Sequence, residues 1–174
     1  MTLFKPLMAA GLALLLPAAA LADSASINVT GRILSSACQP EVNPLNVPLG
    51  TLSQSALAGK GSTASATRFT LRLKNCPAEI SQVQVRFDGS AVSGDTSVLA
   101  LTAGTGVAGG VGIQLQDAGA TVLRFGQPSA AMAIQGGAGS VSSLAFTARY
   151  IAISDTVTAG SANASATFTI LYSN

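Results

Sequence analysis

The chain has no histidine, no tryptophan and little charge, and these gaps exclude several classes of function. Without histidine it lacks the commonest general base and the commonest metal ligand. Charged residues make up 9% of its 174 residues, far below the usual quarter. Its sequence contains no basic cluster, so nucleic acid is not an expected partner.

The first 22 residues have the three parts of a secretory signal peptide. Lys5 is the basic region, residues 7–20 form the apolar run, and Ala20-Leu21-Ala22 is the cleavage site before Asp23. A membrane anchor is the alternative, but the run is short and no stop-transfer pattern follows it. We expect an exported chain that begins at Asp23, with eight basic side chains (nine minus Lys5) against seven acidic ones.

The chain contains two cysteines, Cys38 and Cys76. In an oxidising compartment such a pair is most simply one disulfide, which would stabilise the fold by roughly 4 kcal/mol. Two free thiols or a metal site are the alternatives, and a metal site would need further ligands in a chain without histidine. No cofactor and no metal are expected.

Short runs of alternating apolar and polar residues follow the signal peptide, and helical periodicity is nearly absent. The runs are residues 69–74, 83–88, 97–103, 111–116, 121–125 and 144–153. Between two of them, Asp117-Ala-Gly119 predicts a hairpin turn with Gly119 at a positive φ. Many short strands with frequent turns predict an all-β sandwich or barrel.

Candidate catalytic groups are few and scattered. The acidic residues after the signal peptide form no local pair, and no serine lies in a G-x-S-x-G sequence. A Ser–Lys arrangement that uses Lys60 or Lys74 is the remaining enzymatic alternative. We predict no catalytic residues and no enzymatic activity.

Two further alternating runs lie at the ends of the mature chain. The first reads Ala25-Ser-Ile27-Asn-Val29-Thr-Gly31-Arg-Ile33, and the second is residues 164–174. Each has one apolar face that requires a core. Because the first run lies outside the loop that the disulfide would close, it favours pairing with another molecule. Pairing of both runs within one molecule is the alternative.

Together these features resemble the fimbrial (pilus) subunits that bacteria assemble by the chaperone–usher pathway, particularly type 1-like pilins. The resemblance covers essentially the whole mature chain. Gly160 stands twelve residues before Tyr172, a spacing typical of that family. The other matching segments are Leu73-Lys-Asn-Cys76-Pro77, Val85-Arg-Phe87-Asp-Gly89, Leu99-Ala-Leu101, Gly110-Val-Gly112-Ile113-Gln-Leu115-Gln-Asp117, Val157-Thr-Ala-Gly160 and Ala166-Thr-Phe168-Thr-Ile170-Leu-Tyr172.

The resemblance implies an all-β fold, an incomplete immunoglobulin-like β-sandwich that is completed by a donor strand from another subunit. Residues 23–37 would be the N-terminal donor-strand extension and residues 38–174 the pilin domain. The donor residues that enter the groove would be Ala25, Ile27, Val29, Gly31 and Ile33. The groove and chaperone-binding strand would contribute Gly160, Phe168, Ile170 and Tyr172.

By the same resemblance, a periplasmic chaperone fills the groove first, and the next subunit's extension replaces it at the outer-membrane usher. The expected function is a structural subunit of an adhesive pilus, exported through the periplasm to the cell-surface fimbrium and contributing to cell adhesion. Neighbouring subunits in a homo- or hetero-polymer, the chaperone and the usher are the expected partners. The alternatives are a single-domain secreted adhesin that binds host glycans and, in another class, a secreted β-sandwich hydrolase.

Two details depart from the family pattern. Tyr172 is third from the end rather than penultimate, because Asn174 follows Ser173. The extension before Cys38 has fifteen residues, which resembles minor or tip subunits more than major pilins.

Overall fold

The structure is a computed structural model that describes residues 27, 31, 37–41 and 44–173. Residues Leu34–Asn174 form one compact unit, and the residues before them, of which Ile27 and Gly31 are described, form another. The signal peptide expected in residues 1–22 lies outside the described residues. In the described part of the chain, no helix is long and apolar enough to cross a membrane.

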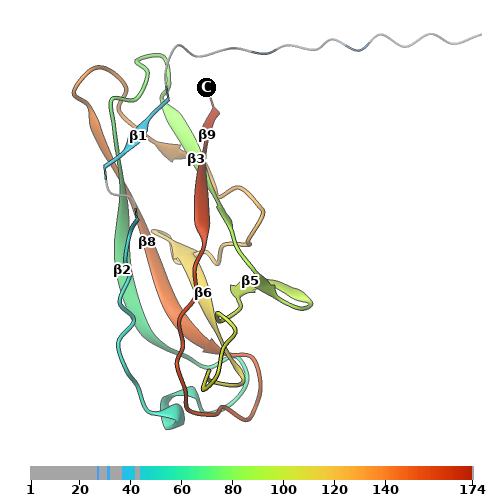
Figure 1. Cartoon of the computed structure of the whole chain (residues 1–174). Coiled ribbons are helices and arrows are strands. Elements are labelled where there is room, and N and C mark those ends of the chain that lie inside the picture. Colours follow the sequence, from blue (N-terminus) through green and yellow to red (C-terminus); the bar gives the residue numbers. More distant parts are fainter. Residues whose placement is uncertain (1–26, 28–30, 32–36, 42–43, 174) are drawn as a thin grey trace, which may run out of the picture. The chain divides into compact units, whose positions relative to one another are not determined.

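Residues 37–173 fold into two antiparallel β-sheets (Figure 1). The larger sheet has the order β1 (Gln39–Pro40), β2 (Thr63–Lys74), β8 (Val141–Ala152), β6 (Val111–Asp117), β5 (Asp95–Leu99) and β4 (Ala91–Val92). The smaller sheet has the order β7 (Met132–Ala133), β3 (Gln82–Asp88) and β9 (Thr167–Ser173). A short 3₁₀ turn covers Gln54–Leu57. The predicted all-β sandwich is confirmed.

Three phenylalanine rings mark the centre of the core between the sheets. Phe69 of β2 stacks on Phe146 of β8 with ring centroids 5.7 Å apart, and Phe87 of β3 meets Phe146 edge-on at 5.2 Å. Alternating burial explains why these segments are strands: along β3, every second residue is buried and the residues between are not. The predicted strands at residues 69–74, 83–88, 111–116 and 144–153 are therefore confirmed, with β2 beginning earlier, at Thr63.

The strand predicted at residues 97–103 is partly wrong, because β5 ends at Leu99. Ala100 N–H still donates to Ser90, in register with the pairing of β4 and β5, whereas Thr102 N–H donates to Asn163 outside that ladder. The second of these bonds ties the segment to the residues that precede β9.

The strand predicted at residues 121–125 is absent apart from a single bridge between Val122 and Gln116. Leu123 N–H donates to Leu115, whereas Phe125 N–H donates to Thr96, so the segment has no continuous partner strand. Leu123 and Phe125 are nevertheless buried. The alternation of apolar and polar residues in this segment therefore reflects the burial of Leu123 and Phe125, and not membership of a β-sheet ladder.

The turn after β6 forms where it was predicted, but its positive φ lies elsewhere. Ala120 has a φ of 64°, and Gly119 is not in the left-handed region. The Asp117 carboxylate holds the turn, since its Oδ1 accepts the N–H groups of Gly119 at 2.9 Å and Thr121 at 2.8 Å. A Cβ on Gly119 would lie 3.3 Å from that oxygen, which favours a residue without a side chain.

Candidate functional site

Strand β9 has one edge paired with β3 and a second edge that faces outward. On β3, Val85 lies opposite Ile170. Its N–H donates to the Ser129 hydroxyl and its carbonyl accepts the Ser129 N–H, so both of its backbone groups point away from β9. Residues along an antiparallel strand point their N–H and C=O groups alternately to the two sides. The even-numbered residues Phe168, Ile170 and Tyr172 therefore direct their backbone groups to the outer edge.

The same three residues also carry the inward side chains of β9. Phe168, Ile170 and Tyr172 are half-buried and pack against the core, whereas Thr167 and Thr169 are exposed. Among the described residues, no backbone hydrogen bond reaches the outer edge of these three. This edge thus combines unpaired backbone groups with apolar side chains that are incompletely covered.

The segment of residues 44–52 runs beside β2, where the carbonyls of Leu49 and Pro48 accept the hydroxyls of Ser65 and Thr67, and its Leu45 side chain lies near Phe168 of β9. Its inward side chains are Leu45, Val47 and Leu49. It is not a strand, and Pro44 and Pro48 have no N–H group with which to join a ladder. In the described part of the chain, no backbone hydrogen bond joins this segment to β9.

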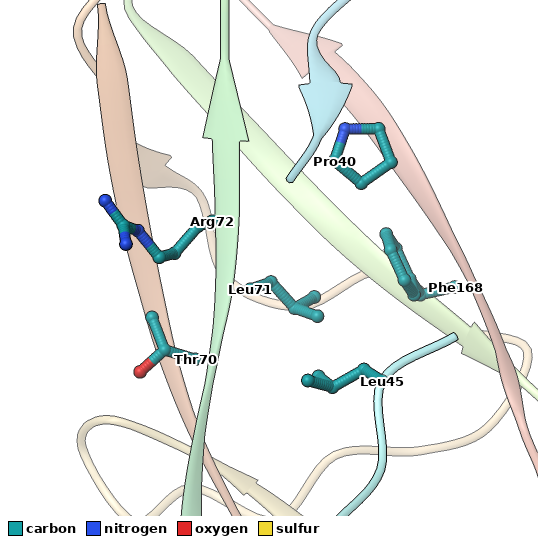
Figure 2. Close-up of a pocket in the computed structure, with 6 residues that line it drawn as sticks. All are labelled: Pro40, Leu45, Thr70, Leu71, Arg72 and Phe168. Carbon is teal, nitrogen blue, oxygen red and sulfur yellow. The ribbon is translucent and has the colours of Figure 1, made fainter. Parts of the chain in front are cut away.

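Two cavities lie between this segment and the C-terminal part of the chain. Leu45 and Phe168 line a small cavity of about 40 Å³, and Leu71 of β2 points toward them (Figure 2). Leu52 and Ala162 line a larger one of about 390 Å³. We call this whole feature the β9 groove, whose half-buried apolar residues are Leu45, Val47, Leu52, Ala162, Ala164, Phe168, Ile170 and Tyr172.

The predicted groove residues lie along this feature. Phe168 lines the small cavity and Gly160 the larger one, whereas Ile170 and Tyr172 line neither cavity and lie farther along β9 as half-buried side chains. A Cβ on Gly160 would overlap the backbone nitrogen of Ala108, so close backbone packing requires glycine there. The role of these four residues in binding a chaperone stays a prediction.

The opposite wall of the groove was not predicted from the sequence. Leu45, Val47 and Leu52 were not among the predicted site residues, although the segment Pro44-Leu-Asn-Val-Pro-Leu49 alternates in the same way as a strand. That alternation is the signal that could have found them, and its two prolines disguised it.

The predicted donor residues are described only in part. Ala25, Val29 and Ile33 lie outside the described residues. Ile27 is 87% exposed, and a Cβ on Gly31 would meet no atom within 4 Å. The donor role of this segment stays a prediction.

The predicted disulfide between Cys38 and Cys76 is confirmed. It lies near the start of the unit that forms the two sheets. There the backbone N–H of Cys38 donates to the Tyr172 hydroxyl at 2.9 Å. The start of the domain and the end of β9 therefore meet at one hydrogen bond.

Titratable groups do not gather into a reactive site in the described part of the chain. No three His, Cys, Asp or Glu residues lie close enough there to hold a metal ion. The pKa of Asp95 is lowered from its usual 3.8, chiefly because its carboxylate accepts the Ser97 hydroxyl at 2.6 Å and then the Ser97 N–H at 2.9 Å. This pair lies on an exposed strand end and has the geometry of a local cap.

Comparison with known proteins identifies the family. The family model described as fimbrial protein matches residues 27–173. The chain belongs to the fimbrial protein family. Over 164 residues it is 33% identical to the type-1 fimbrial protein A chain of Escherichia coli K12, covering 90% of this chain and 88% of the relative. Over 166 residues it is 34% identical to a type-1 fimbrial protein subunit of Serratia marcescens, covering 88% and 89%.

Solved structures agree with this assignment. The antigen and type I fimbria protein of Burkholderia pseudomallei has a TM-score of 0.60 and 37% identity, covering 79% of this chain and 90% of that one. The rod subunit of the P pilus has a TM-score of 0.63 over 79% of this chain and 100% of its own, and at 24% identity it supports the fold alone. The predicted resemblance is confirmed, and this member of the family is a structural subunit of a pilus with an immunoglobulin-like fold.

Proposed function

We propose that this subunit polymerises by strand exchange, with residues 23–36 of one copy or of a related subunit filling the β9 groove of the next. A periplasmic chaperone would occupy the groove first, and the exchange would take place at the outer-membrane usher. The observation that carries the proposal is the outer edge of β9, where the same residues have half-covered apolar side chains and find no backbone partner among the described residues. Such an edge is suited to an added strand.

The N-terminal extension has the pattern that this edge requires. Ala25, Ile27, Val29, Gly31 and Ile33 alternate with polar residues, so all five would face the core of an acceptor subunit. Burial of Ile27, Val29 and Ile33 would contribute about 1.5–3 kcal/mol each. A shift of the donor strand by one residue would turn all five side chains to solvent. The possible registers therefore differ from one another by two residues.

The direction of the donor strand follows from where the extension begins. It leaves the domain next to Tyr172, at the end of β9. In a head-to-tail polymer, it would enter the next groove at the opposite end, where β9 starts. Its N-terminus would then point toward the acceptor's Tyr172, and the donor strand would run antiparallel to β9.

The volumes of the two cavities favour one register of the donor strand against β9. Directly opposite residues of an antiparallel pair place their side chains on the same face. With Gly31 opposite Phe168, the residue without a side chain meets the cavity of about 40 Å³. Ile33 then lies opposite Ala166, toward the end of the groove with the cavity of about 390 Å³. The same register pairs Ile27 with Tyr172 and Val29 with Ile170.

We further infer that the subunit has no enzymatic activity and reaches the cell-surface fimbrium through the periplasm. Its family is structural, and the strand-binding edge uses side chains without acid–base chemistry. The signal peptide predicted in residues 1–22 would direct the export.

Substitution of Gly31 tests the proposed exchange. Purified mature chains are compared as wild type, Gly31→Arg and Thr30→Arg, with SDS-resistant ladders on unheated gels as the readout. Gly31→Arg should abolish the ladders because it places a charged side chain in the small cavity. Thr30→Arg is the matched control, because in the proposed pairing position 30 would face away from the acceptor's core, as position 32 would, where the native residue is already Arg32. Ladders from the Gly31→Arg chain, or a stable wild-type monomer, would contradict the proposal.

A size exchange tests the register. We call a synthetic peptide of residues 23–36 the donor peptide. A Gly31→Leu donor peptide should bind the wild-type chain poorly and a Phe168→Ala chain better, whereas an Ile170→Ala chain should not rescue it. Rescue by Ile170→Ala instead would shift the register by two residues and leave the exchange itself intact.

A further inference from the structure

The root of the N-terminal extension is held from both sheets. On the larger sheet, β1 pairs Gln39 with Lys74 and Pro40 with Leu73. Cys38 is bonded to Cys76, two residues beyond the end of β2. On the smaller sheet, the contact is the Tyr172 hydroxyl, which accepts the Cys38 N–H at 2.9 Å.

Tyr172 therefore makes two contacts, one through its backbone and one through its hydroxyl. Its backbone belongs to β9, where its partner is Val83 and its outer edge lies in the groove. Its hydroxyl reaches the residue from which the extension departs, and Cys38 is itself buried. An N–H group that loses its hydrogen bond in a buried position is costly, so the contact should restrict the orientation of the root.

We propose that Tyr172 is a positioning residue for donation: its hydroxyl fixes the root of the extension against the strand that accepts the previous subunit. Its ring contributes to accepting a strand, and its hydroxyl contributes to presenting one. A filled groove pairs the outer edge of β9 and thereby holds Tyr172, so the subunit that has accepted a strand presents its own extension in a defined direction. The inference rests on the strand exchange proposed above.

The test separates donation from acceptance in full-length mature chains. Acceptance is the rate at which a chain takes up labelled donor peptide. Donation is the rate at which a chain already filled with donor peptide forms SDS-resistant dimers with a Gly31→Arg chain, which can accept a strand but not give one. The variant is Tyr172→Phe, which keeps the ring. The control is Glu41→Gln, which removes the exposed ion pair between Glu41 and Arg72 on the other side of the same root.

For Tyr172→Phe, we expect the ratio of donation to acceptance to fall about fivefold, the effect of one ordinary hydrogen bond. Glu41→Gln should leave the ratio within about twofold of wild type, since exposed ion pairs contribute little. An unchanged ratio for Tyr172→Phe, including equal losses in both rates, would overturn the positioning role. A wild-type chain that takes up no peptide would instead overturn the exchange itself, and that outcome is visible without any variant.

Hydrogen exchange gives a second measurement that does not depend on assembly rates. In the peptide-filled wild-type chain, the Cys38 amide should be protected, as should the Glu41 amide, which donates to the Arg72 carbonyl at 2.8 Å. In Tyr172→Phe, the Cys38 amide should lose about fivefold in protection while the Glu41 amide keeps its own. A wild-type Cys38 amide that exchanges freely would overturn the proposal even if the variant failed to fold.

Discussion

The two long sides of the small sheet differ in how the chain covers them. On the outer side of β3, the chain supplies its own partners: Met132 of β7 pairs with Val83, Ser129 bonds both backbone groups of Val85, and Gly126 N–H donates to Phe87. On the outer side of β9, the described residues supply no such partner. A sheet edge left open is a hazard in a soluble protein, and this chain covers the one it does not need. Under the proposed strand exchange, the β9 edge is the one left for a strand from another molecule.

The largest expected loss in the free energy of unfolding comes from a phenylalanine of the core, and it should differ from the loss caused by a phenylalanine of the β9 groove. Phe146 is 1% exposed, so Phe146→Ala should lower the free energy of unfolding by about 3–5 kcal/mol, with or without donor peptide. Phe168→Ala should cost less in the empty chain, because Phe168 is half-exposed there, and more once the groove is filled. Denaturant unfolding of both variants measures this. An equal cost for Phe168→Ala with and without peptide would remove the distinction.

A smaller effect is expected from the glycine that closes the far end of the groove. Gly160→Ala should destabilise the chain by about 1–3 kcal/mol, because the new Cβ would meet the backbone of residues 106–108. Gly104→Ala is the matched control, since the nearest atom to its Cβ would be a Val107 methyl group at 3.7 Å. Thermal unfolding compares the two, and equal stabilities would show that the backbone at Gly160 yields freely.

One substitution should remove a hydrogen bond that covers the outer side of β3. Ser129→Ala removes the hydroxyl that accepts the buried Val85 N–H at 3.0 Å, and this should cost about 1–2 kcal/mol. The Val85 amide should then exchange faster, while the Thr169 amide, on the β3 side of β9, should change little. Amide exchange read residue by residue checks this, and an unchanged Val85 amide would mean that another group replaces Ser129.

The smallest effect concerns acid stability away from both edges. Because the folded chain holds the pKa of Asp95 below 3.8, this carboxylate stabilises the fold at pH values above about 4, and the contribution is lost as the pH falls through the folded pKa. The group is exposed, so the loss should be slight. Ser97→Ala should flatten the fall in stability below about pH 4. An identical acid profile for the variant would exclude this contribution.

Most of the fold could be predicted from the sequence, and the exceptions have physical causes. Strands β2, β3 and β8 were found because burial on one face imposes a period of two. The same rule failed at Leu123 and Phe125, which are buried without belonging to a ladder. At the turn after β6, the rule that glycine takes the positive φ failed because the Asp117 carboxylate sets the geometry and Ala120 takes that conformation.

Only one side of the candidate site could be predicted from the sequence, because only that side is a regular strand. The apolar residues of β9 lie in one alternating run, and they were found. The opposite wall, residues 44–52, alternates in the same way but is interrupted by Pro44 and Pro48, which prevent a strand. The bond between Cys38 and Tyr172 joins residues 134 positions apart through a single hydroxyl, and nothing in the sequence marks it.

Amide exchange on β9 is the direct test of whether the outer edge of this strand pairs with an added strand. Exchange is measured for the mature chain with and without donor peptide, at the residues that face outward and at those that face β3. We expect the amides of Phe168, Ile170 and Tyr172 to become protected when the peptide binds, while the amides of Thr169 and Leu171 change little. Peptide binding that leaves the three even-numbered amides as exposed as before would contradict it.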